Sequence, residues 1–413
     1  MSQKMNIKHI LRTLILFLVR LIGAPGIYRS TQRTKHKLST PPRILIIRPD
    51  HLGDLLLATP VLNALREHAP DAHITMMVGP WSREIVARHP AIDHILTCPF
   101  PGFQRAAQKP LAPYTLLFQT ARELKNAHYD LAINLRYDFW WGAALIYLAS
   151  IPRRVGYAIQ PGRPFLNYAL PFPEPEHATV SNLRLTSSGL QALGYKALEE
   201  PFAPKRYPLH FATTDEERAW VDTQLTATET PVIVVHPGTG AAVKLWRTEA
   251  WAQCANSISA NTSSTKQVQI VLTGSKSEQS MLLEIAQDMQ TAPLILCEMT
   301  VGQLAAVLER AMLVLGVDSG PLHLAVAQNT PTIQLFGPTD ERIFGPWGIP
   351  EQHPVIRATQ KCVGCPAIPC GRLDFGPEEV SLHPCMRLIP ENVVDEAIEQ
   401  LSTKLFKTSL HIK

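Results

Sequence analysis

Short apolar segments of strand length alternate with longer amphipathic segments along most of the chain. Apolar runs at 43–48, 73–78 and 129–135 are typical of strands that are buried on both faces of a sheet. The segments between them, such as 53–68, carry apolar residues at helical spacing, with Pro60 expected to bend that helix. A second series of the same kind runs from 232 to 336. Regular alternation of strand and helix predicts the α/β class with mostly parallel sheets.

Proline-rich stretches indicate how the chain is divided. At 413 residues the chain is long for one hydrophobic core, so two domains are expected. Residues 158–176 are predicted to be a loop, and 199–208, with three prolines, marks the boundary between domains. The chain is predicted to divide into an N-terminal arm and linker at 1–42, a Rossmann-like domain at 43–205, a second at 206–389, and a helix at 390–413 that packs back across the domains.

The stretch 311–340 shows the strongest candidate chemistry. An apolar strand leads into Asp318, Ser319 and Gly320, which open a short helix with His323 in or just after its first turn. Free helical N–H groups beyond the carboxyl end of a parallel strand suit an anionic ligand such as a diphosphate. Asp318 is better suited to sugar hydroxyls than to phosphate. The alternatives are a well-capped helix without a ligand and a buried core histidine.

Two further turns come directly after predicted strands of the second series. Thr239 and Gly240 lie in a Gly-rich turn at 236–240, and Lys244 follows it closely. N–H groups and an ammonium both neutralise anionic oxygens, so this turn is a candidate diphosphate site, although Lys244 on a solvated loop is an equal alternative. Glu278, after the next strand, either accepts hydrogen bonds from ribose hydroxyls or begins its own helix.

In the first series the corresponding turn is 48–54. It places Asp54 in the first turn of a helix, at the carboxyl end of a strand. A carboxylate in this position suits a general base that takes a proton from an attacking hydroxyl. The alternative is that Asp54 only complements the helix dipole.

Charge is distributed unevenly along the chain. Hydrophobic residues make up 46% and charged residues 18%, which is typical of a globular protein. Residues 1–40 contain eight Lys or Arg and no acidic residue, which leaves 31 basic and 35 acidic residues in the remaining 373. The body is therefore mildly acidic, which argues against nucleic-acid binding.

The basic N-terminal arm has an apolar centre at 14–22 that Arg20 interrupts. This centre falls well short of the roughly 20 apolar residues that a spanning helix needs. An interfacial helix on an anionic membrane surface is the favoured interpretation. A signal peptide or signal anchor, a helix packed on the body and a disordered tail are the alternatives.

Four of the seven cysteines lie close together near the C-terminus. Cys362, Cys365, Cys370 and Cys385 have the spacing C-x2-C-x4-C-x14-C. The first pair has metal-ligand spacing, but the other two do not form a second such pair. A structural zinc or iron–sulfur site, reduced packing cysteines and one disulfide all remain open.

Taken together, these motifs resemble those of glycosyltransferase family nine, similar to the ADP-heptose:lipopolysaccharide heptosyltransferases. The resemblance covers residues 43–400 and is carried, in order, by the stretches 44–67, 234–253, 272–278 and 316–340. It implies the GT-B architecture, in which two Rossmann-like α/β domains face a central cleft. Asp54 then acts from the first domain, so that transfer requires the two halves to close.

The resemblance also assigns roles to the candidate residues. Asp54 looks like the base toward the acceptor, and Lys244 like the residue that steadies the diphosphate. The other positions that match the binding site of the sugar donor are Thr239, Gly240, Glu278, Asp318, Ser319, Gly320 and His323. These matches imply an inverting transfer that needs no bound metal and no cofactor other than a nucleotide-sugar donor.

The function implied is transfer of a sugar, with ADP-heptose as the expected donor, to lipopolysaccharide core or another lipid-linked saccharide. A peripheral location on the inner face of the cytoplasmic membrane would fit both this acceptor and the basic arm. The alternatives are another nucleotide-sugar enzyme of GT-B architecture, such as an epimerase, and a non-catalytic nucleotide-binding protein.

Overall fold

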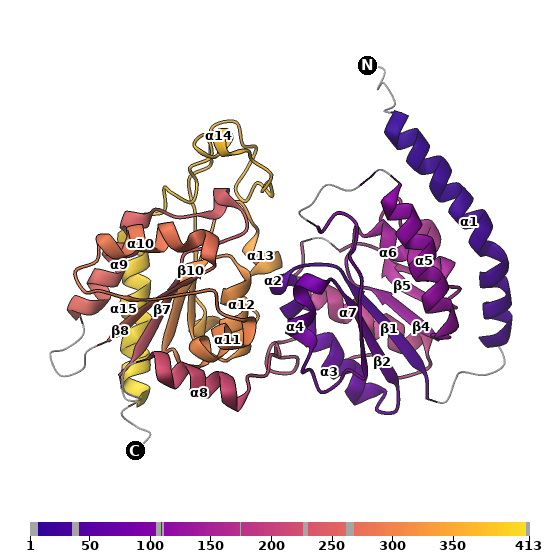
Figure 1. Cartoon of the computed structure of the whole chain (residues 1–413), viewed down its shortest axis with the longest axis horizontal. Coiled ribbons are helices and arrows are strands. Elements are labelled where there is room, and N and C mark those ends of the chain that lie inside the picture. The colour runs from indigo at the N-terminus through magenta and orange to yellow at the C-terminus, as the bar shows by residue number, and fades with distance from the viewer. Residues whose placement is uncertain are drawn as a thin grey trace. The chain divides into compact units, whose positions relative to one another are not determined.

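The structure is a computed structural model of the chain, shown in Figure 1. It describes residues 7–34, 41–104, 109, 111–173, 175–225, 230–261 and 268–409. Parts of the basic arm, including Lys4 and the linker residues 35–40, lie outside the described residues. The chain forms two compact units, Met1–His51 with Ala58–Phe202, and Leu52–Leu57 with Ala203–Lys413.

The first unit contains a parallel six-stranded sheet among its described residues, in the order β3-β2-β1-β4-β5-β6. The strands are β1 Arg43–Arg48, β2 His73–Val78, β3 His94–Thr97, β4 Leu131–Asn134, β5 Arg153–Tyr157 and β6 Tyr168–Leu170. The helices are α1 Ile7–Thr34, α3 Thr59–His68, α4 Arg83–Val86, α5 Ala112–Asn126, α6 Trp140–Leu148 and α7 Ala178–Ala192, with short 3-10 turns η1 Pro80–Ser82 and η2 Arg163–Phe165.

The second unit repeats this arrangement, with the parallel order β12-β11-β10-β7-β8-β9. Its strands are β7 Val232–His236, β8 Gln269–Gly274, β9 Leu294–Cys297, β10 Leu313–Val317, β11 Thr332–Phe336 and β12 Val355–Arg357. Its helices are α2 Leu52–Leu56, α8 Asp215–Gln224, α9 Thr248–Asn261, α10 Gln279–Gln287, α11 Val301–Arg310, α12 Gly320–Ala327, α13 Glu341–Phe344, α14 Pro377–Val380 and α15 Glu391–Ser409, with 3-10 turns η3 Ala242–Lys244, η4 Lys276–Glu278 and η5 Pro350–Gln352.

The prediction of two Rossmann-like α/β domains is confirmed. The central strands are buried on both faces: Ile44 to Ile47 in β1 and Leu313 to Leu315 in β10 are 0% exposed. Capping boxes form at the start of two helices of the second unit. Thr214 accepts a hydrogen bond from the Glu217 amide at the start of α8, and Thr300 accepts the equivalent bond from Gln303 in α11.

The structure differs from the sequence prediction at three elements. The helix expected over 53–68 is two helices, α2 and α3, because Pro60 lies in the first turn of α3 and cannot donate a hydrogen bond back into α2. Strand β6, within the predicted loop 158–176, and strand β12 are edge strands of three residues. Segments this short give no periodicity to detect.

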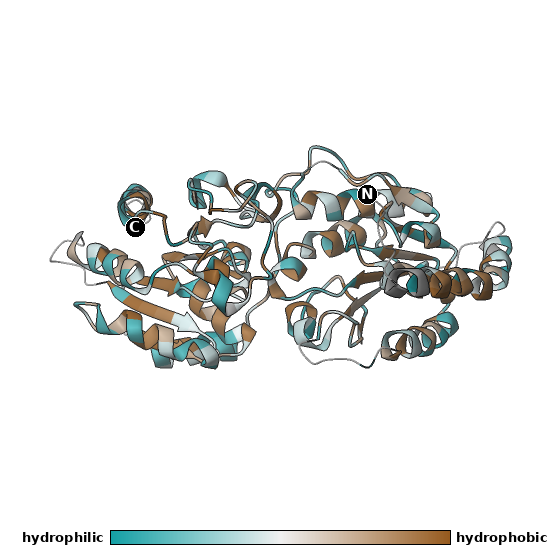
Figure 2. Ribbon diagram, turned by 90° about the horizontal axis from the view of Figure 1, so that it is seen from above, coloured by the Kyte–Doolittle hydropathy of each residue, from teal (hydrophilic) through white to brown (hydrophobic). Residues whose placement is uncertain are grey.

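Helix α1 packs on α6 along one face only. Leu16 and Val19 are buried in the core of the first unit, and the Tyr147 hydroxyl donates to the Arg20 carbonyl oxygen at 3.0 Å. The other face exposes more than half of each large apolar side chain at 14, 17, 18, 21 and 22. Figure 2 shows a stretch of α1 in the colour of hydrophobic residues. By length and composition alone Arg12–Gln32 could cross a membrane, which corrects the expectation that this segment is too short.

The C-terminal helix α15 packs along α9 within the second unit. Its apolar residues Val394, Ile398 and Leu401 join the same core as Trp251. The expectation that this helix packs across both domains stays a prediction.

Candidate active site

Three adjacent strands of the second unit, β7, β10 and β11, end in turns that each carry a buried hydroxyl. The oxygens of Thr239, Ser319 and Thr339 have no hydrogen-bond partner within the described part of the chain. Leaving a buried polar group unpaired costs about 1–3 kcal/mol, which a ligand that hydrogen-bonds to it would recover. Parallel strands bring their carboxyl ends to one edge of the sheet, where a bound molecule can satisfy all three hydroxyls. Thr239 and Ser319 were predicted site residues, whereas Thr339 was not.

Ser319 occupies the N-cap position of α12, yet its side chain makes no capping hydrogen bond. The hydroxyls of Thr214 and Thr300 do cap their helices. The alternative to a ligand at this stretch was a helix that is only well capped. In such a helix the Ser319 hydroxyl would accept a capping hydrogen bond from a backbone amide of α12. The absence of that bond therefore favours a ligand at the N-terminus of α12.

An ion pair joins two of the candidate turns. Lys244 Nζ lies 3.0 Å from Asp318 Oδ2, and the two side chains are 13% and 8% exposed. The sequence assigned these two residues different roles, Lys244 on the diphosphate and Asp318 on the sugar hydroxyls, and did not predict their pairing. Their pairing holds the ammonium close to the start of α12, where cationic and N–H groups add their effects on an anion.

Helix α2, which carries Asp54 in its first turn, packs against α12 within the second unit. The approach is close: a Cβ on Gly320 would lie 3.1 Å from the Gly53 amide nitrogen, and one on Gly53 would lie 3.1 Å from His323 Cδ2. Asp54 is half-buried and His323 is 4% exposed. The structure therefore brings the candidate base, Gly320 and His323 together. It groups Asp54 with the second unit, whereas the sequence predicted it in the first domain.

Glu278 caps its own helical turn. This is the local role that the sequence offered as the alternative to binding ribose hydroxyls. Its Oε2 accepts hydrogen bonds from the Ser275 amide at 2.8 Å and the Ser275 hydroxyl at 2.7 Å. Its Oε1 faces the Gly-rich turn, where a Cβ on Gly238 would lie only 2.1 Å away. Glu278 is therefore in contact with the predicted phosphate turn. Gly240 itself is exposed, with nothing within 4 Å of a Cβ placed on it.

His236, the last residue of β7, is buried just before the Gly-rich turn. Its Nδ1 is 3.0 Å from the Thr273 hydroxyl oxygen. Burial lowers the pKa of His236 to about 4, although the Glu278 carboxylate acts in the opposite direction. The ring is therefore neutral at physiological pH and contributes no positive charge to this site.

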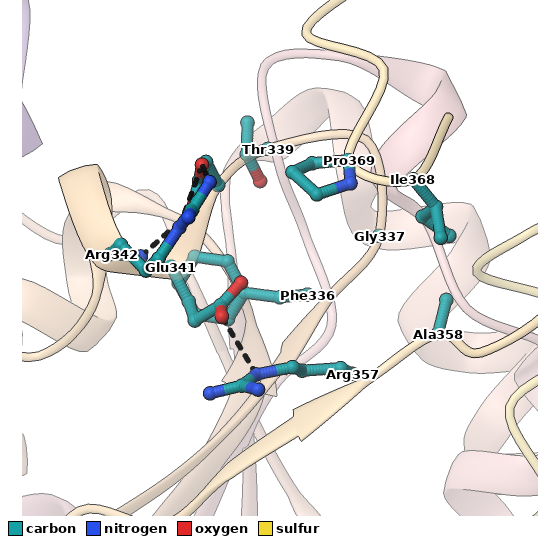
Figure 3. A pocket seen from close by; sticks show the side chains of 10 residues that line it. Phe336, Gly337, Thr339, Glu341, Arg342, Arg357, Ala358, Ile368 and Pro369 are labelled. Carbon is teal, nitrogen blue, oxygen red and sulfur yellow. Dashed lines mark hydrogen bonds and ion pairs between the residues drawn. The ribbon is translucent and has the colours of Figure 1, made fainter. Parts of the chain in front are cut away.

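A pocket of about 340 Å³ lies at the same edge of the sheet, beyond β11 and β12. Figure 3 shows its wall, which includes Phe336, Thr339, Arg342, Arg357, Ile368 and Pro369. Glu341 and Arg357 form an ion pair of 2.7 Å on this wall. The volume lies within the range of small-molecule sites. None of the residues predicted to hold the donor lines this pocket, and of the three hydroxyls only that of Thr339 does.

In the first unit, a buried carboxylate at the equivalent sheet edge was not predicted as a site residue. Asp50, 2% exposed, pairs with Arg48 at 2.7 Å and with Arg136, which follows β4. Burial acts against the charge of Arg136, but the Asp50 and Asp138 carboxylates outweigh it and raise its pKa. Trp81 also donates from Nε1 to the Asp50 carbonyl oxygen at 3.2 Å. These contacts fix the turn that leads into α2.

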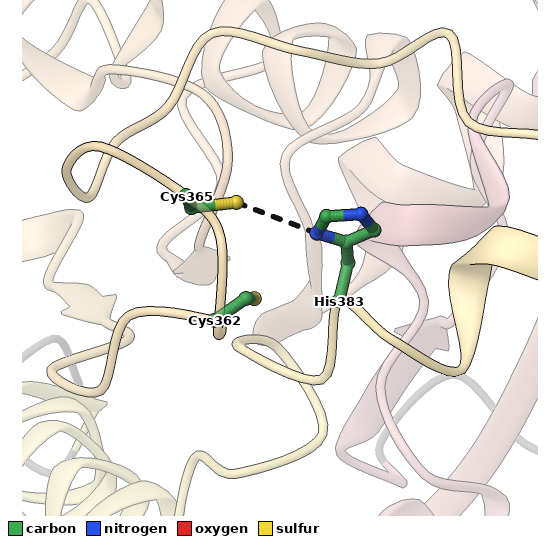
Figure 4. Close-up of side chains that lie close together, drawn as sticks. All are labelled: Cys362, Cys365 and His383. Carbon is green, nitrogen blue, oxygen red and sulfur yellow. Dashed lines mark hydrogen bonds between the residues drawn. The ribbon is translucent and has the colours of Figure 1, made fainter.

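The cysteine cluster is partly assembled, with a histidine that the sequence spacing did not point to. Cys362, Cys365 and His383 place their ligand atoms within 4.8 Å of one another, as Figure 4 shows. Cys370 and Cys385 adjoin them. Burial and the neighbouring thiols of Cys362 and Cys370 raise the pKa of Cys385 to about 12. All seven cysteines are free thiols, so the alternative of a disulfide is not realised in this structure.

Comparisons with known proteins agree on one family. The profile of Glycosyltransferase family 9 (heptosyltransferase) matches residues 117–370, which is more than half of the chain. Lipopolysaccharide heptosyltransferase 3 of Escherichia coli is 27% identical over 304 residues, covering 71% of this chain and 83% of that protein.

Two solved structures share the fold. A family 9 glycosyltransferase from Veillonella parvula DSM 2008 has a TM-score of 0.68 at 22% identity, covering 88% of this chain and 97% of that one. E. coli ADP-heptose lps heptosyltransferase II has a TM-score of 0.67 at 20% identity, with 89% and 99% coverage. The GT-B fold implied by the resemblance is therefore confirmed. The chain belongs to glycosyltransferase family 9 and is an enzyme that transfers a sugar from a nucleotide sugar.

Proposed function

We infer that this protein transfers a heptose from ADP-heptose, with inversion, to lipopolysaccharide core or another lipid-linked saccharide. The observation that carries the proposal is the Lys244–Asp318 ion pair next to the Ser319 hydroxyl, which is buried without a partner in the described part of the chain, at the start of α12. Diphosphate oxygens are strong acceptors for hydroxyl, amide and ammonium donors alike. One of the structures with the same fold is an ADP-heptose enzyme, which supports adenosine diphosphate as the leaving group.

Binding of the donor would use both turns next to α12. Ser319, Thr239 and the free N–H groups of α12 are suited to the two phosphates, with Lys244 as their countercharge. Asp318 cannot attract phosphate, but its carboxylate suits hydroxyls of the sugar and orients the Lys244 ammonium at 3.0 Å. Gly240 leaves its turn open for a close approach of the ligand to the backbone.

In the transfer step the acceptor hydroxyl oxygen forms a bond to C1 of the sugar while the bond from C1 to the β-phosphate oxygen breaks. Asp54 takes the proton of the attacking hydroxyl, and ADP leaves on the opposite face, so the anomeric centre inverts. Negative charge grows on the departing diphosphate. Lys244 and the N–H groups of α12 are positioned to stabilise this charge, which supports a transfer that needs no bound metal in the reaction itself.

The decisive experiment titrates a panel of nucleotide sugars into the purified chain and then measures transfer to lipopolysaccharide-core acceptor. We expect tight binding of ADP-heptose and formation of product only when acceptor is present. Asp54→Asn should keep donor affinity and lower the transfer rate by about 10²–10⁴-fold. Asp215→Asn, which removes an exposed first-turn carboxylate from α8, is the matched control for a helix-dipole effect.

The rival functions give different outcomes in the same assay. An epimerase would form a new nucleotide sugar, or release nucleotide, without consuming acceptor. A non-catalytic binding protein would bind ADP and form no product with any acceptor. Near-normal transfer by Asp54→Asn would show that Asp54 is not the base.

We also propose that α1 lies on an anionic membrane surface at the inner face of the cytoplasmic membrane. Its exposed face combines large apolar side chains with Arg20 and Arg29. The opposite face packs on the core of the first unit through Leu16 and Val19. This packing favours a helix that lies at the membrane–water interface over one that spans the bilayer. A surface location would bring the active site to a lipid-linked acceptor.

The triple substitution Leu18→Ser, Leu21→Ser and Ile22→Ser tests this location. It removes exposed apolar area but leaves Leu16 and Val19 in the core, unlike deletion of the arm. We expect the triple variant to lose co-sedimentation with phosphatidylglycerol vesicles, and the wild-type protein to be released from these vesicles at high salt. Leu283→Ser, at a 48% exposed position on α10, is the control. Unchanged vesicle binding by the triple variant would refute the docking surface, and resistance to salt and alkaline extraction would indicate a spanning helix.

A further inference from the structure

The segment between β12 and α15 is long and has little regular structure. Residues 358–390 contain one short helix, α14, and otherwise turns and irregular backbone. Irregular segments of this length in a compact domain need some other source of order. Nevertheless Cys362, Cys365 and Cys385 within it are 5%, 8% and 4% exposed.

The side chains that cluster there are metal ligands in type and geometry. Cys362 and Cys365 flank a tight turn closed by a hydrogen bond from the Cys365 amide to the Cys362 carbonyl oxygen at 3.1 Å. Cys365 Sγ lies 3.3 Å from His383 Nδ1, and all three ligand atoms are within 4.8 Å of one another. Two cysteine sulfurs and an imidazole nitrogen this close together match the ligand types of a tetrahedral zinc or mononuclear iron site.

The surroundings hold these ligands in place. Gly364, inside the Cys turn, has a φ of +86°, a backbone conformation that favours glycine. The ring of Phe375 stacks on His383 with centroids 3.7 Å apart, which fixes the imidazole plane. Cys370 lies next to Cys365 and Cys385 next to Cys362; both are outside the group of three ligand atoms within 4.8 Å, and either is near enough to be the candidate fourth ligand. Ordered positions of this kind are typical of metal sites, in which outer contacts orient the ligands.

We propose that this cluster binds one tetrahedrally coordinated metal ion, zinc or a single iron, through Cys362, Cys365, His383 and one adjacent cysteine. The ion holds the irregular segment against the turn that follows β11. Three contacts make this connection: Gly371 donates from its amide to the Pro338 carbonyl oxygen at 2.8 Å, a Cβ on Gly337 would lie 3.4 Å from Cys385 Sγ, and Ile368 and Pro369 line the pocket beside Thr339. The ion is structural and takes no part in the proposed proton transfer at Asp54.

Metal analysis of the full-length chain, purified without chelators or an immobilised-metal column, tests the site directly. We expect about one equivalent of zinc or iron per chain, and less than about a tenth in Cys362→Ser and Cys365→Ser. Cys254→Ser, at a buried cysteine of α9 outside the cluster, should keep full metal content. Less than about a tenth of an equivalent in the wild-type protein, before and after incubation with zinc, would overturn the proposal. Acid-labile sulfide would also overturn it, since it indicates an iron–sulfur cluster.

Cobalt substitution identifies the ligands without depending on activity. Tetrahedral Co²⁺ bound by thiolates gives a sulfur-to-metal charge-transfer band whose intensity falls with each thiolate removed. His383→Ala should keep the charge-transfer band but alter the ligand-field spectrum, and Cys370→Ser or Cys385→Ser should lower the band at the position that supplies the fourth ligand. An unchanged ligand-field spectrum in His383→Ala would exclude that residue from the set.

The effect on the neighbouring site rests on the proposed function and is measured separately. Metal-depleted protein should bind ADP about tenfold more weakly and regain affinity when zinc is restored. If the purified protein contains the metal but its ADP affinity does not change when the metal is removed, the connection to the β11 turn is overturned. Failure of the proposed function would give a different result: protein with its full metal content would not bind ADP at all.

Discussion

Replacing Ser319 with alanine should make the ligand-free protein more stable and its binding of ADP weaker. A buried hydroxyl without a partner lowers the stability of the folded state by about 1–3 kcal/mol. Loss of an N-cap serine usually costs about 1 kcal/mol, but Ser319 makes no capping hydrogen bond to lose. The cavity left by one oxygen atom is small. We therefore expect a gain of about 1 kcal/mol in the free energy of unfolding.

Binding should change in the opposite direction. A hydrogen bond from this hydroxyl to a charged phosphate oxygen contributes about 1.5–3 kcal/mol. Its loss corresponds to a rise in the Kd for ADP of roughly 10- to 100-fold. A change that stabilises the protein but weakens binding is the expected signature of a polar group that is held ready for a ligand.

Thr300→Ala is the matched control, because the Thr300 hydroxyl accepts from the Gln303 amide at 3.1 Å and so has a structural partner. This variant should lose about 1 kcal/mol of stability and keep its affinity for ADP. Denaturant unfolding and isothermal titration calorimetry measure the two quantities independently. If Ser319→Ala were destabilised like the control and bound ADP normally, the interpretation of the unpartnered hydroxyls would be refuted.

The same geometry supports three further predictions. Lys244→Met leaves the buried Asp318 carboxylate without its countercharge and should lower the free energy of unfolding by about 3 kcal/mol; adding Asp318→Asn should restore stability but not ADP affinity. Gly320→Ala places a Cβ 2.4 Å from Leu52 Cδ2 and 3.1 Å from the Gly53 amide nitrogen, so the Leu52 side chain must move and the α2 backbone must give way slightly; transfer activity should fall more than ADP affinity. Burial lowers the pKa of His353 to about 4, so below pH about 6.5 the unfolded chain binds a proton at this residue that the folded protein does not. The free energy of unfolding should therefore fall by about 3 kcal/mol between pH about 6.5 and 4. His353→Gln should reduce this dependence on pH, as measured by denaturant unfolding.

The central strands were predicted well from the sequence because burial on both faces leaves an unambiguous apolar run. Strands 43–48 and 73–78 begin and end where the pattern places them, and the second series starts with β7 at 232 and ends with β11 at 336. The edge strands β6 and β12 contain three residues each, too few for any periodicity. Helix starts were predicted where side chains supply the cap, as Thr214 and Thr300 do.

The candidate site was predictable where its residues are contiguous in sequence and not where it is assembled from distant turns. Asp318, Ser319 and Gly320 are adjacent, and capping chemistry alone drew attention to them. The pairing of Lys244 with Asp318, 74 positions away, depends on β7 and β10 being neighbours in the sheet. His383 was missed for a different reason, because an irregular loop separates it from the first Cys pair. Thr339 was missed for the same reason as the Lys244–Asp318 pairing. Strand order, rather than residue type, decides these contacts.

The break between α2 and α3 gives the catalytic proposal its clearest structural basis. With Pro60 in the first turn of α3, the helix that carries Asp54 is separate from the one that follows it. Helix α2 can then pack on α12, in the second unit, while α3 remains in the core of the first. The near-contact of Gly53 with Gly320 fixes α2 beside the proposed phosphate turn. If Asp54 is the base and α12 holds the donor, as proposed, the alignment of Asp54 with the sugar depends on the α2–α12 contact.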